Sequence, residues 1–573
     1  DQVYAAAPEQ AADISNDWPF IQRLLEQDDN RAVAEFDLDV STQCFIQDHV
    51  LYSNELSELD PSLVALPVVP LTASLEMLAE IAALLSTHPY LTALENVRAY
   101  NWIALDEGTK TVRLVSDRVS SSESEERIHA AIYDGENILL EGDMLFTPGL
   151  PGNEALLPEL VTPTAPIWSD DSLYTTGMFH GPLYHSVRHL EAWDETGIDV
   201  QLGDTALAGF FGPYSQPNFF LNPVLMDAVG HLTAFWIAQQ RGTDFSSFPS
   251  QIRRFELVNP EVEATAGYRM RGRMAFLDTE GQQGRFHEGN YDCLDTEGNA
   301  IFRILGWRDR FFDVPHSFYQ GRTHPRDNWY GEDWSSIYPD LPADILVWSV
   351  PPFPPGFLED AGAVWKRLLV YTLLSREERG IWPTLPVNPR RRSEWLMGRI
   401  ALKEAARYWI AQHYGVLLYP ADIIIRTDEA GKPYVAADGL ETLGEPPQIS
   451  LSHASGYSVA VAGPAHISVG IDLETFGRIK LPDFISGAFT SMEKSHVESV
   501  PEEQREEFAL RMWCAKEAAA KSLGMGLNGR PSMFEVRELS SDGMMAIVHS
   551  PNHLIPVSIQ REGESIISLA TIS

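Results

Sequence analysis

Two short segments near the C-terminal end, with the sequences GIDLE and WCAKEAAAK, most constrain what this chain can fold into. The first predicts a β-strand, on which residues two apart share a face, so Asp472 and Glu474 point the same way. The second predicts a helix, on which Glu517 and Lys521, four residues apart, share a face. Three carboxylates and a lysine can therefore converge, and such hard oxygen ligands suit Mg²⁺ that carries substrate phosphates. Either segment alone is more often a simple acid pair or an exposed Glu–Lys helix pair.

Together and in this order, the two segments resemble the signature of surfactin-type 4′-phosphopantetheinyl transferases, a (V)G(I)D(I/L)E strand followed by a W(C/S/T)xKE(A/S)xxK helix. Enzymes of that family move phosphopantetheine from coenzyme A (CoA) to a serine of an acyl carrier protein. The resemblance implies that Asp472, Glu517 and Glu474 bind Mg²⁺ at the CoA pyrophosphate. It also implies that Glu517, or a water on the metal, takes the serine proton. Lys516 and Lys521 would stabilise the phosphates, and Lys521 could protonate the leaving oxygen.

Three earlier blocks resemble the CoA-binding part of the same family: RRSEWLMGRIALK, GKPY and ISLSHA. In the first block, basic residues recur at three- and four-residue helical spacing, and guanidinium groups grip phosphate oxygens in bidentate fashion. A basic helix face is otherwise more often only solvated surface. The residues expected to bind CoA are Arg392, Arg399, Lys403, Lys432, Pro433, Ser452 and His453.

The front part of the chain shows a weak internal duplication of a long antiparallel sheet around one apolar helix. The helices are expected at 72–86 and 223–239. Period-two alternation and turn residues such as Asp134-Gly135 predict the strands. The expected strands are 34–40, 111–117, 127–133, 137–146, a group within 187–210, 268–277, 284–293 and 300–312.

This layout resembles the double hot-dog dehydratase domain of polyketide and related fatty-acid synthases. His49 stands where that family places a catalytic histidine, and NPVLMDAVGH resembles its (H/N)PxLxDxxxQ/H motif, with Asp227 as the acid and His231 one helical turn later. GMFHGPLY resembles the GYxYGPxF loop, so Tyr184 and the backbone near Gly181 would shape the substrate tunnel. The chain departs from the family pattern at Ser53, where the family has glycine, and by about twelve extra residues before Pro70.

Removing water from a β-hydroxyacyl thioester needs a base for the α-proton and an acid for the departing hydroxyl. A neutral imidazole, with a reference pKa of about 6.5, suits His49 for the base role. Burial in an apolar tunnel would raise the pKa of Asp227 and keep it protonated as the donor, with His231 orienting it. Taken singly, His49 is more often a loop or core histidine, and Asp227 a first-turn acid favoured by the helix dipole.

The whole chain excludes several classes of partner. Its 42 basic and 81 acidic residues give a net charge of −39, which disfavours nucleic acid and anionic membranes. No segment approaches the ~20 uninterrupted apolar residues that span a bilayer. The three cysteines lack metal-site spacing and are typical of reduced thiols in a cytoplasmic protein. A start at Asp1 suggests a fragment of something longer.

We therefore expect an α+β protein with a linker at 1–30, a double hot-dog dehydratase at 31–315, a connector at 316–344 and a two-lobed, pseudo-symmetric α/β transferase at 345–573. Resemblance implies CoA, Mg²⁺, an acyl carrier protein in cis or in trans, and a possible homodimer through the dehydratase. It points to the C-terminal part of an iterative polyketide synthase. Two alternatives remain: a non-catalytic hot-dog scaffold beside an active transferase, or a CoA-binding module whose transferase site is dead.

Overall fold

The computed structural model describes residues 18–572 except 52–54, 107, 153–155, 177, 204, 206, 213–214, 260–266, 278–284, 478–480 and 528. The expected linker up to residue 17, and Ser53, lie outside the described residues. The chain divides into two compact units: Asp1–Asn54 with Val64–Tyr319, and Glu55–Leu63 with Gln320–Ser573.

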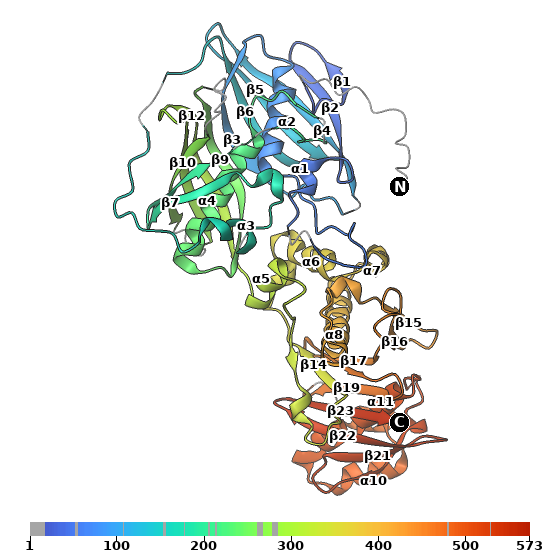
Figure 1. Cartoon of the computed structure of the whole chain (residues 1–573). Coiled ribbons are helices and arrows are strands. Elements are labelled where there is room, and N and C mark those ends of the chain that lie inside the picture. The colour runs from blue at the N-terminus through green and yellow to red at the C-terminus, as the bar shows by residue number, and fades with distance from the viewer. Residues whose placement is uncertain are drawn as a thin grey trace. The chain divides into compact units, whose positions relative to one another are not determined.

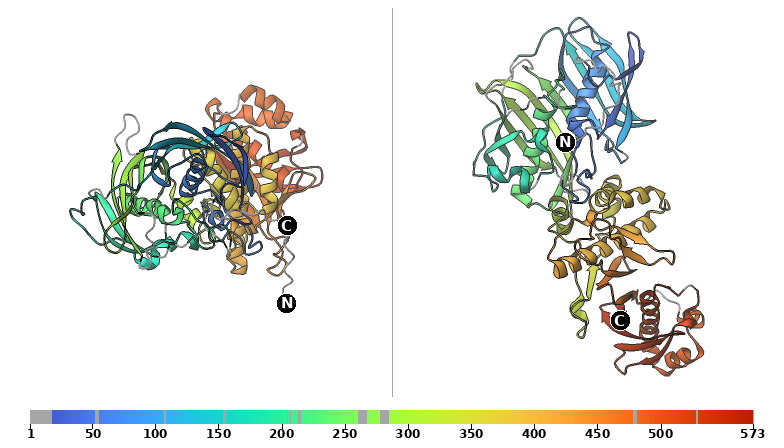
Figure 2. Two further views of the ribbon diagram at one scale, coloured as in Figure 1. Left: turned by 90° about the horizontal axis from the view of Figure 1, so that it is seen from above. Right: turned by 45° about the vertical axis from the view of Figure 1, so that its right-hand side comes forward.

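The first unit is one antiparallel sheet wrapped around two helices, α2 (Leu71–Ala83) and α4 (Pro223–Arg241) (Figures 1 and 2). Each half of the sheet curves around one helix, as the duplication predicts. In sheet order the strands are β1 (Arg23–Gln27), β2 (Arg31–Asp39), β4 (Thr109–Ser121), β5 (Glu126–Asp134), β6 (Asn137–Thr147), β3 (Tyr90–Ala99), β9 (Phe245–Leu257), β12 (Ala300–Asp313), β11 (Phe286–Leu294), β10 (Tyr268–Leu277), β8 (Gly197–Leu202) and β7 (Val187–Asp194).

The two halves join where β3 pairs antiparallel with β9, with Leu94 opposite Phe255. The strand β3 was not predicted, because its burial does not alternate: four consecutive residues from Leu91 are buried and its pairing with β6 is broken by register shifts. Helix α2 is buried along almost its whole length, including Glu76 and Glu80. Two helices surrounded by sheet therefore form the core of this unit.

The local sequence sets the start of helix α4. Asn222 caps it by accepting a hydrogen bond of 2.9 Å from the Leu225 N–H, and Pro223 occupies the first turn. A capping side chain followed by proline is a strong helix start, since proline has no N–H to leave unsatisfied. The start at Pro223 agrees with the sequence prediction.

The second unit contains two α/β lobes, as predicted. In the first lobe, α8 (Pro389–Tyr414) packs against the sheet β13 (Glu332–Asp333), β14 (Leu346–Val350), β18 (Tyr457–Gly463) and β17 (Gln448–Ala454). In the second, α11 (Arg505–Ser522) packs against the sheet β19 (Ser468–Thr475), β23 (Ser565–Ile572), β22 (Leu554–Glu562), β21 (Met545–His549) and β20 (Glu535–Leu539).

Smaller elements complete both units. They are α1 (Cys44–Gln47), α3 (Leu173–Thr176), α5 (His316–Thr323), α6 (Asp360–Leu373), α7 (Arg376–Ile381), β15 (Ile425–Thr427), β16 (Pro433–Val435), α9 (Leu481–Ala488) and α10 (Ser491–Ser499). The described part of the chain has no helix long and apolar enough to cross a membrane.

The segment Glu55–Leu63 contains most of the extra residues expected inside the dehydratase, yet it belongs to the second unit. There, Ser57 Oγ donates a hydrogen bond to the Asp422 carboxylate, and the N–H of Leu59 donates to the same carboxylate at 3.2 Å. Arg376 Nε lies 2.8 Å from Asp60 Oδ2. Side-chain pairing with this unit, which the sequence pattern does not reveal, decides where the segment lies.

Candidate active sites

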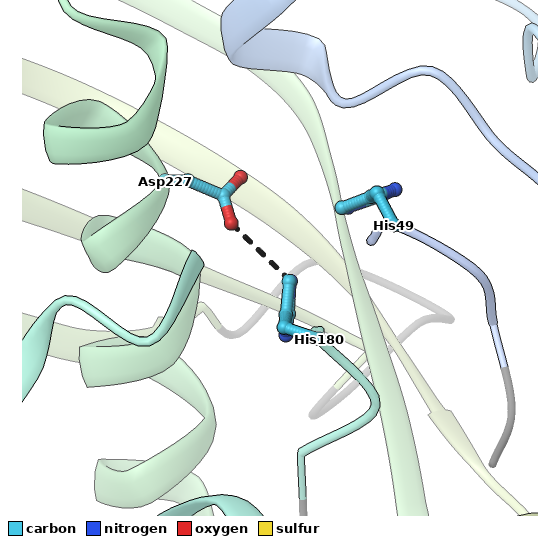
Figure 3. Close-up of side chains that lie close together, drawn as sticks. All are labelled: His49, His180 and Asp227. Carbon is cyan, nitrogen blue, oxygen red and sulfur yellow. Dashed lines mark ion pairs between the residues drawn. The ribbon is translucent and has the colours of Figure 1, made fainter. Parts of the chain in front are cut away.

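In the first unit, three separate elements bring His49, His180 and Asp227 together (Figure 3). His49 follows α1, His180 precedes the short turn Pro182–Tyr184, and Asp227 lies in the first turns of α4. The ligand atoms of the three side chains all lie within 4.8 Å of one another, and His49 and Asp227 are each 8% exposed. The two residues expected to share a tunnel therefore do lie side by side.

The protonation state of His49 is fixed by burial and by one backbone contact. Its Nδ1 lies 2.7 Å from the carbonyl oxygen of Val68, so Nδ1 carries the proton and Nε2 keeps its lone pair. Burial lowers the pKa of His49, and the opposing charge of Asp227 does not offset this. The imidazole is therefore neutral near neutral pH, as a general base requires.

Asp227 corrects the expectation of a protonated acid. Burial by itself raises the pKa of Asp227, but His180 Nε2 lies 3.2 Å and His231 Nε2 3.5 Å from Asp227 Oδ2. These two imidazoles outweigh burial and hold the pKa of the carboxyl well below its usual range. Asp227 is therefore ionised, because its surroundings include two histidines and are not purely apolar.

His180 is the site residue that sequence reasoning missed. Burial, together with the neighbouring His231, lowers the pKa of His180 to about 3, so its ring is neutral. A signal was present, because His180 stands at the second aromatic position of the GYxYGPxF-like loop. The neighbouring Tyr184, expected to shape the tunnel, is instead fully buried and donates its hydroxyl to the Phe45 carbonyl at 3.0 Å.

His231 lies where the sequence places it, one turn after Asp227. Its Nδ1 is 3.3 Å from the Tyr174 hydroxyl, which accepts a hydrogen bond of 2.9 Å from the Val187 N–H. Because one lone pair of the phenol accepts from Val187, its hydroxyl proton can be donated to His231 Nδ1. The imidazole is thereby held with Nε2 toward Asp227.

In the second unit, Asp472 on β19 meets Lys521 on α11. Lys521 Nζ donates a 2.7 Å hydrogen bond to Asp472 Oδ1, and Ser452 Oγ on β17 donates to the same oxygen at 2.9 Å. Asp472 Oδ2 is buried and accepts no hydrogen bond from the residues that the structure describes. Burial lowers the pKa of Lys521, but the Asp472 carboxylate outweighs it and raises the pKa, so the ammonium stays charged.

Glu517 faces the same carboxylate. Burial and the negative charge of Asp472 raise the pKa of Glu517, and the charge of Glu474 adds to the effect. A buried carboxylate oxygen without a partner, beside a carboxyl that resists ionisation, is the environment that a divalent cation relieves. The residues present therefore fit Mg²⁺, held by Asp472 and Glu517 with Glu474 nearby.

The approach of α11 to β19 depends on Gly470. A Cβ at this position would lie 2.1 Å from the Ala518 carbonyl oxygen and 2.4 Å from the Ser522 nitrogen. Only glycine lets the helix backbone come this close to the strand. The glycine of GIDLE thus brings Asp472 within reach of Lys521.

Comparison with known proteins finds a family match in each unit. Residues 468–570 match the model of the 4′-phosphopantetheinyl transferase superfamily, and residues 151–314 match the polyketide synthase dehydratase N-terminal domain. The holo-[acyl-carrier-protein] synthase of Geobacillus sp. (strain WCH70) is 34% identical over 88 residues, which cover 15% of this chain and 70% of that protein. The chain belongs to the 4′-phosphopantetheinyl transferase superfamily. It also carries a polyketide synthase dehydratase domain.

Other relatives match over less of their length. The 4′-phosphopantetheinyl transferase psf-1 of Bacillus pumilus is 32% identical over 24% of this chain, and the chain spans 54% of that protein. The 4′-phosphopantetheinyl transferase of Bacillus subtilis is 28% identical over 28% of this chain and 63% of its own length. Among solved structures, the dehydratase domain from the CurF module of curacin polyketide synthase has 13% identity and a TM-score of 0.39, covering 52% of this chain and all (100%) of that domain.

The basic helix of the transferase unit corrects another expectation. Lys403 is fully buried, where it pairs with Glu378 of α7 and donates a 3.0 Å hydrogen bond to the Pro420 carbonyl. Arg399 donates to the Ile425 carbonyl and lies 3.5 Å from the same glutamate. Both side chains hold the first lobe together and do not present their charges to CoA, because a partner on another helix occupies them.

Arg392 and Lys516 are also engaged elsewhere. Arg392 donates hydrogen bonds of 3.0 and 3.1 Å to the carbonyls of Leu385 and Pro386. Lys516 is fully buried and lies 2.8 Å from Glu493 Oε2. Both were expected at CoA phosphates. Arg392 instead contacts a loop of the first lobe, and Lys516 contacts α10 of the second lobe.

The remaining residues expected to bind CoA are Ser452, His453, Lys432 and Pro433, and they do not lie together. Ser452 is buried and faces Asp472, whereas His453, the next residue on the strand, points to the opposite side. His453 lines a cavity of about 270 Å³ together with Arg390 and the segment 352–356. Lys432, next to Pro433, reaches Gln448 at 3.0 Å and lies near Gly524, just beyond α11.

Proposed function

We propose that the second unit transfers 4′-phosphopantetheine from CoA to a serine of an acyl carrier protein. The observation that carries this proposal is the buried contact of Asp472 with Lys521 and Glu517, in a chain of the transferase superfamily. Asp472 and Glu517 would hold Mg²⁺, which when bound neutralises charge on the CoA pyrophosphate. His453 and Arg390 line the cavity that suits the nucleotide part of CoA.

The residues of the chain would then act as follows. Glu517, whose ionisation a bound cation would favour, takes the proton from the carrier serine, whose oxygen attacks the β-phosphate of CoA. The bond from the β-phosphorus to the bridging oxygen breaks, and adenosine 3′,5′-bisphosphate leaves. Lys521, held charged by Asp472, stabilises the charge on that oxygen and can protonate it.

Incubating the full chain with CoA, Mg²⁺ and an apo carrier protein tests the transferase directly. Mass spectrometry should show the carrier gaining one phosphopantetheine group, and the Asp472→Asn variant should lose this activity while keeping its fold by circular dichroism. An unmodified carrier under all conditions would favour the alternative of a CoA-binding module with a dead site. Comparing the rate of transfer to different apo carriers then identifies the natural carrier, in cis or in trans.

We also propose that the first unit removes water from β-hydroxyacyl chains attached to the same carrier arm. His49 Nε2 takes the α-proton, and the C–O bond of the β-hydroxyl breaks as the double bond forms. With Asp227 ionised and His180 neutral, the departing hydroxyl takes the proton that His49 Nε2 has just accepted, and the Asp227 carboxylate stabilises the intervening imidazolium. Neutral His49 beside an ionised Asp227 supports the proposal.

Loss of water from a model β-hydroxyacyl thioester, followed for the full chain and for His49→Ala and Asp227→Asn, tests the dehydratase. Both variants should lose the activity and keep the transfer of phosphopantetheine, which serves as an internal control of folding. An inactive parent chain with an active transferase would favour the alternative of a hot-dog scaffold.

A further inference from the structure

His180 adds a second imidazole to the histidine and carboxylate that dehydration requires. Among the described residues, His49, His180 and Asp227 form the group whose potential metal ligands all lie within 4.8 Å of one another. The three side chains converge from a loop, a turn and a helix (Figure 3). We propose that they form a binding site for a divalent transition-metal cation, for which zinc is the best match.

The ligand types select this class of cation. Two imidazole nitrogens and one carboxylate oxygen suit Zn²⁺ and its neighbours, whereas Mg²⁺ and Ca²⁺ prefer oxygen ligands alone. Three protein ligands with an open fourth position are also the usual arrangement of zinc sites accessible to small molecules. The site therefore differs in chemistry from the carboxylate pair of the transferase unit.

The spacing of the atoms fits such a cation. Two ligands at 2.0–2.1 Å from a tetrahedral ion lie about 3.3 Å apart, and His180 Nε2 is 3.2 Å from Asp227 Oδ2. A ring nitrogen of His49 lies within 4.8 Å of a ring nitrogen of His180 and of a carboxylate oxygen of Asp227. A movement of His49 of about 1.5 Å or less would complete the set.

The surrounding groups prepare two of the ligands. The Val68 carbonyl binds His49 Nδ1 at 2.7 Å, an outer contact that leaves Nε2 for a metal. Thr72 Oγ1 lies 3.4 Å from Asp227 Oδ1, and Asp227 Oδ2 is buried without a hydrogen bond from any described residue. A buried carboxylate oxygen that lies beside imidazole nitrogens and lacks a hydrogen bond is the arrangement that a cation would satisfy.

The backbone also holds the two histidine-bearing loops together. The N–H groups of Gly181 and Leu183 donate 2.7 Å hydrogen bonds to the carbonyl and to Oδ2 of Asp48, the residue before His49. The loops that carry His49 and His180 are therefore held side by side before any ion arrives. Such preorganisation favours binding, because less ordering is needed when the ion enters.

Occupancy of this site has a consequence that rests on the proposed dehydratase activity. A cation on His49 Nε2 and Asp227 Oδ2 would occupy the base and the carboxylate that stabilises its protonated form at once. Zinc would then inhibit dehydration and leave phosphopantetheine transfer unaffected. Metal binding itself does not depend on whether the unit is an active dehydratase.

The test titrates the metal-free full chain with Zn²⁺, in competition with a chromophoric chelator and in excess Mg²⁺ to saturate oxygen-ligand sites. We expect one Zn²⁺ bound per chain. His180→Phe should weaken binding on the order of 100-fold, and His49→Gln similarly, since each removes one ligand. His189→Gln, which removes an exposed histidine paired with Asp170, should bind as the parent does.

Two further measurements keep the proposal falsifiable. Co²⁺ in place of zinc should give visible absorption bands that are lost in His180→Phe and in the milder His180→Gln. Zinc should raise the unfolding temperature of the parent chain and of His189→Gln, and should not raise that of the His180 and His49 variants. Zinc binding that is absent, or unchanged in both His180 variants, would overturn the proposal. An inactive dehydratase that still binds zinc through His180 would overturn only the proposed function of this unit.

Discussion

The N–H of Gly181 donates a 2.7 Å hydrogen bond to the Asp48 carbonyl, and this contact sets His180 beside His49. A Cβ at position 181 would lie 2.6 Å from the Asp48 side chain and 2.9 Å from its Cα. The loop can therefore approach Asp48 this closely only through glycine.

Gly181→Ala should accordingly separate the two histidine loops. We expect a loss of about 1–3 kcal/mol in the free energy of unfolding of the first unit, together with a strong fall in dehydration. Urea unfolding and the thioester assay would measure both. Gly149→Ala, where a Cβ meets nothing within 4 Å, is the matched control and should change neither.

Lys403 should act as a structural residue and not as a CoA ligand. Lys403→Ala removes the nearer of the two charged partners of the buried Glu378, so the second unit should lose about 3 kcal/mol of stability. Lys403→Met combined with Glu378→Leu removes both charges and should recover most of that loss. Unfolding curves measure the stability. A weaker affinity for CoA in the folded double variant would contradict this assignment.

Lys521 should contribute to the chemistry of transfer. Lys521→Met removes the ammonium that lies 2.7 Å from Asp472 Oδ1, and the transfer rate should fall on the order of 10²-fold. Steady-state transfer to an apo carrier measures this effect. Lys494→Met is the control, since this half-buried lysine on α10 donates its hydrogen bond to the Ser486 carbonyl at 3.2 Å. Equal rates for the two variants would show that Lys521 has no part in transfer.

The buried carboxyl of Glu80 should make the first unit less stable as pH rises. Burial, and secondarily Glu76, raise the pKa of Glu80 well above its usual value, so the folded state retains a proton that the unfolded chain releases above about pH 4.5. The stabilising effect of that proton is complete below this pH and is lost as pH rises toward the folded-state pKa.

Glu80→Gln keeps the hydrogen-bonding shape without the titration, and should flatten the decline in unfolding free energy between about pH 5 and about pH 8. Urea unfolding of both proteins across this range provides the comparison. Because Glu76 shares the core with Glu80 and its pKa is also raised, a residual slope should remain. Parallel curves for the variant and the parent would refute the prediction.

Features set by a few neighbouring residues were predicted from the sequence, and features that depend on distant segments were not. Asn222 and Pro223 specify the start of α4 within one turn, and the GIDLE strand and the WCAKE helix carry their own periodicity, so these elements were predicted well. Strand β3 was missed because bulges interrupt its alternation. The helical spacing of Arg399 and Lys403 predicted a shared face, but it does not reveal that Glu378 of another helix lies opposite that face.

The sequence by itself determined which families this chain resembles, where α2 and α4 begin, and that Asp472, Lys521, His49 and Asp227 are candidate site residues, because motif spacing and caps act over a few residues. Only the tertiary structure decided which charges are free and which are occupied, and that His180 joins His49 and Asp227. Burial and partners contributed by distant segments set the pKa and accessibility of each side chain, and neither is encoded in local spacing.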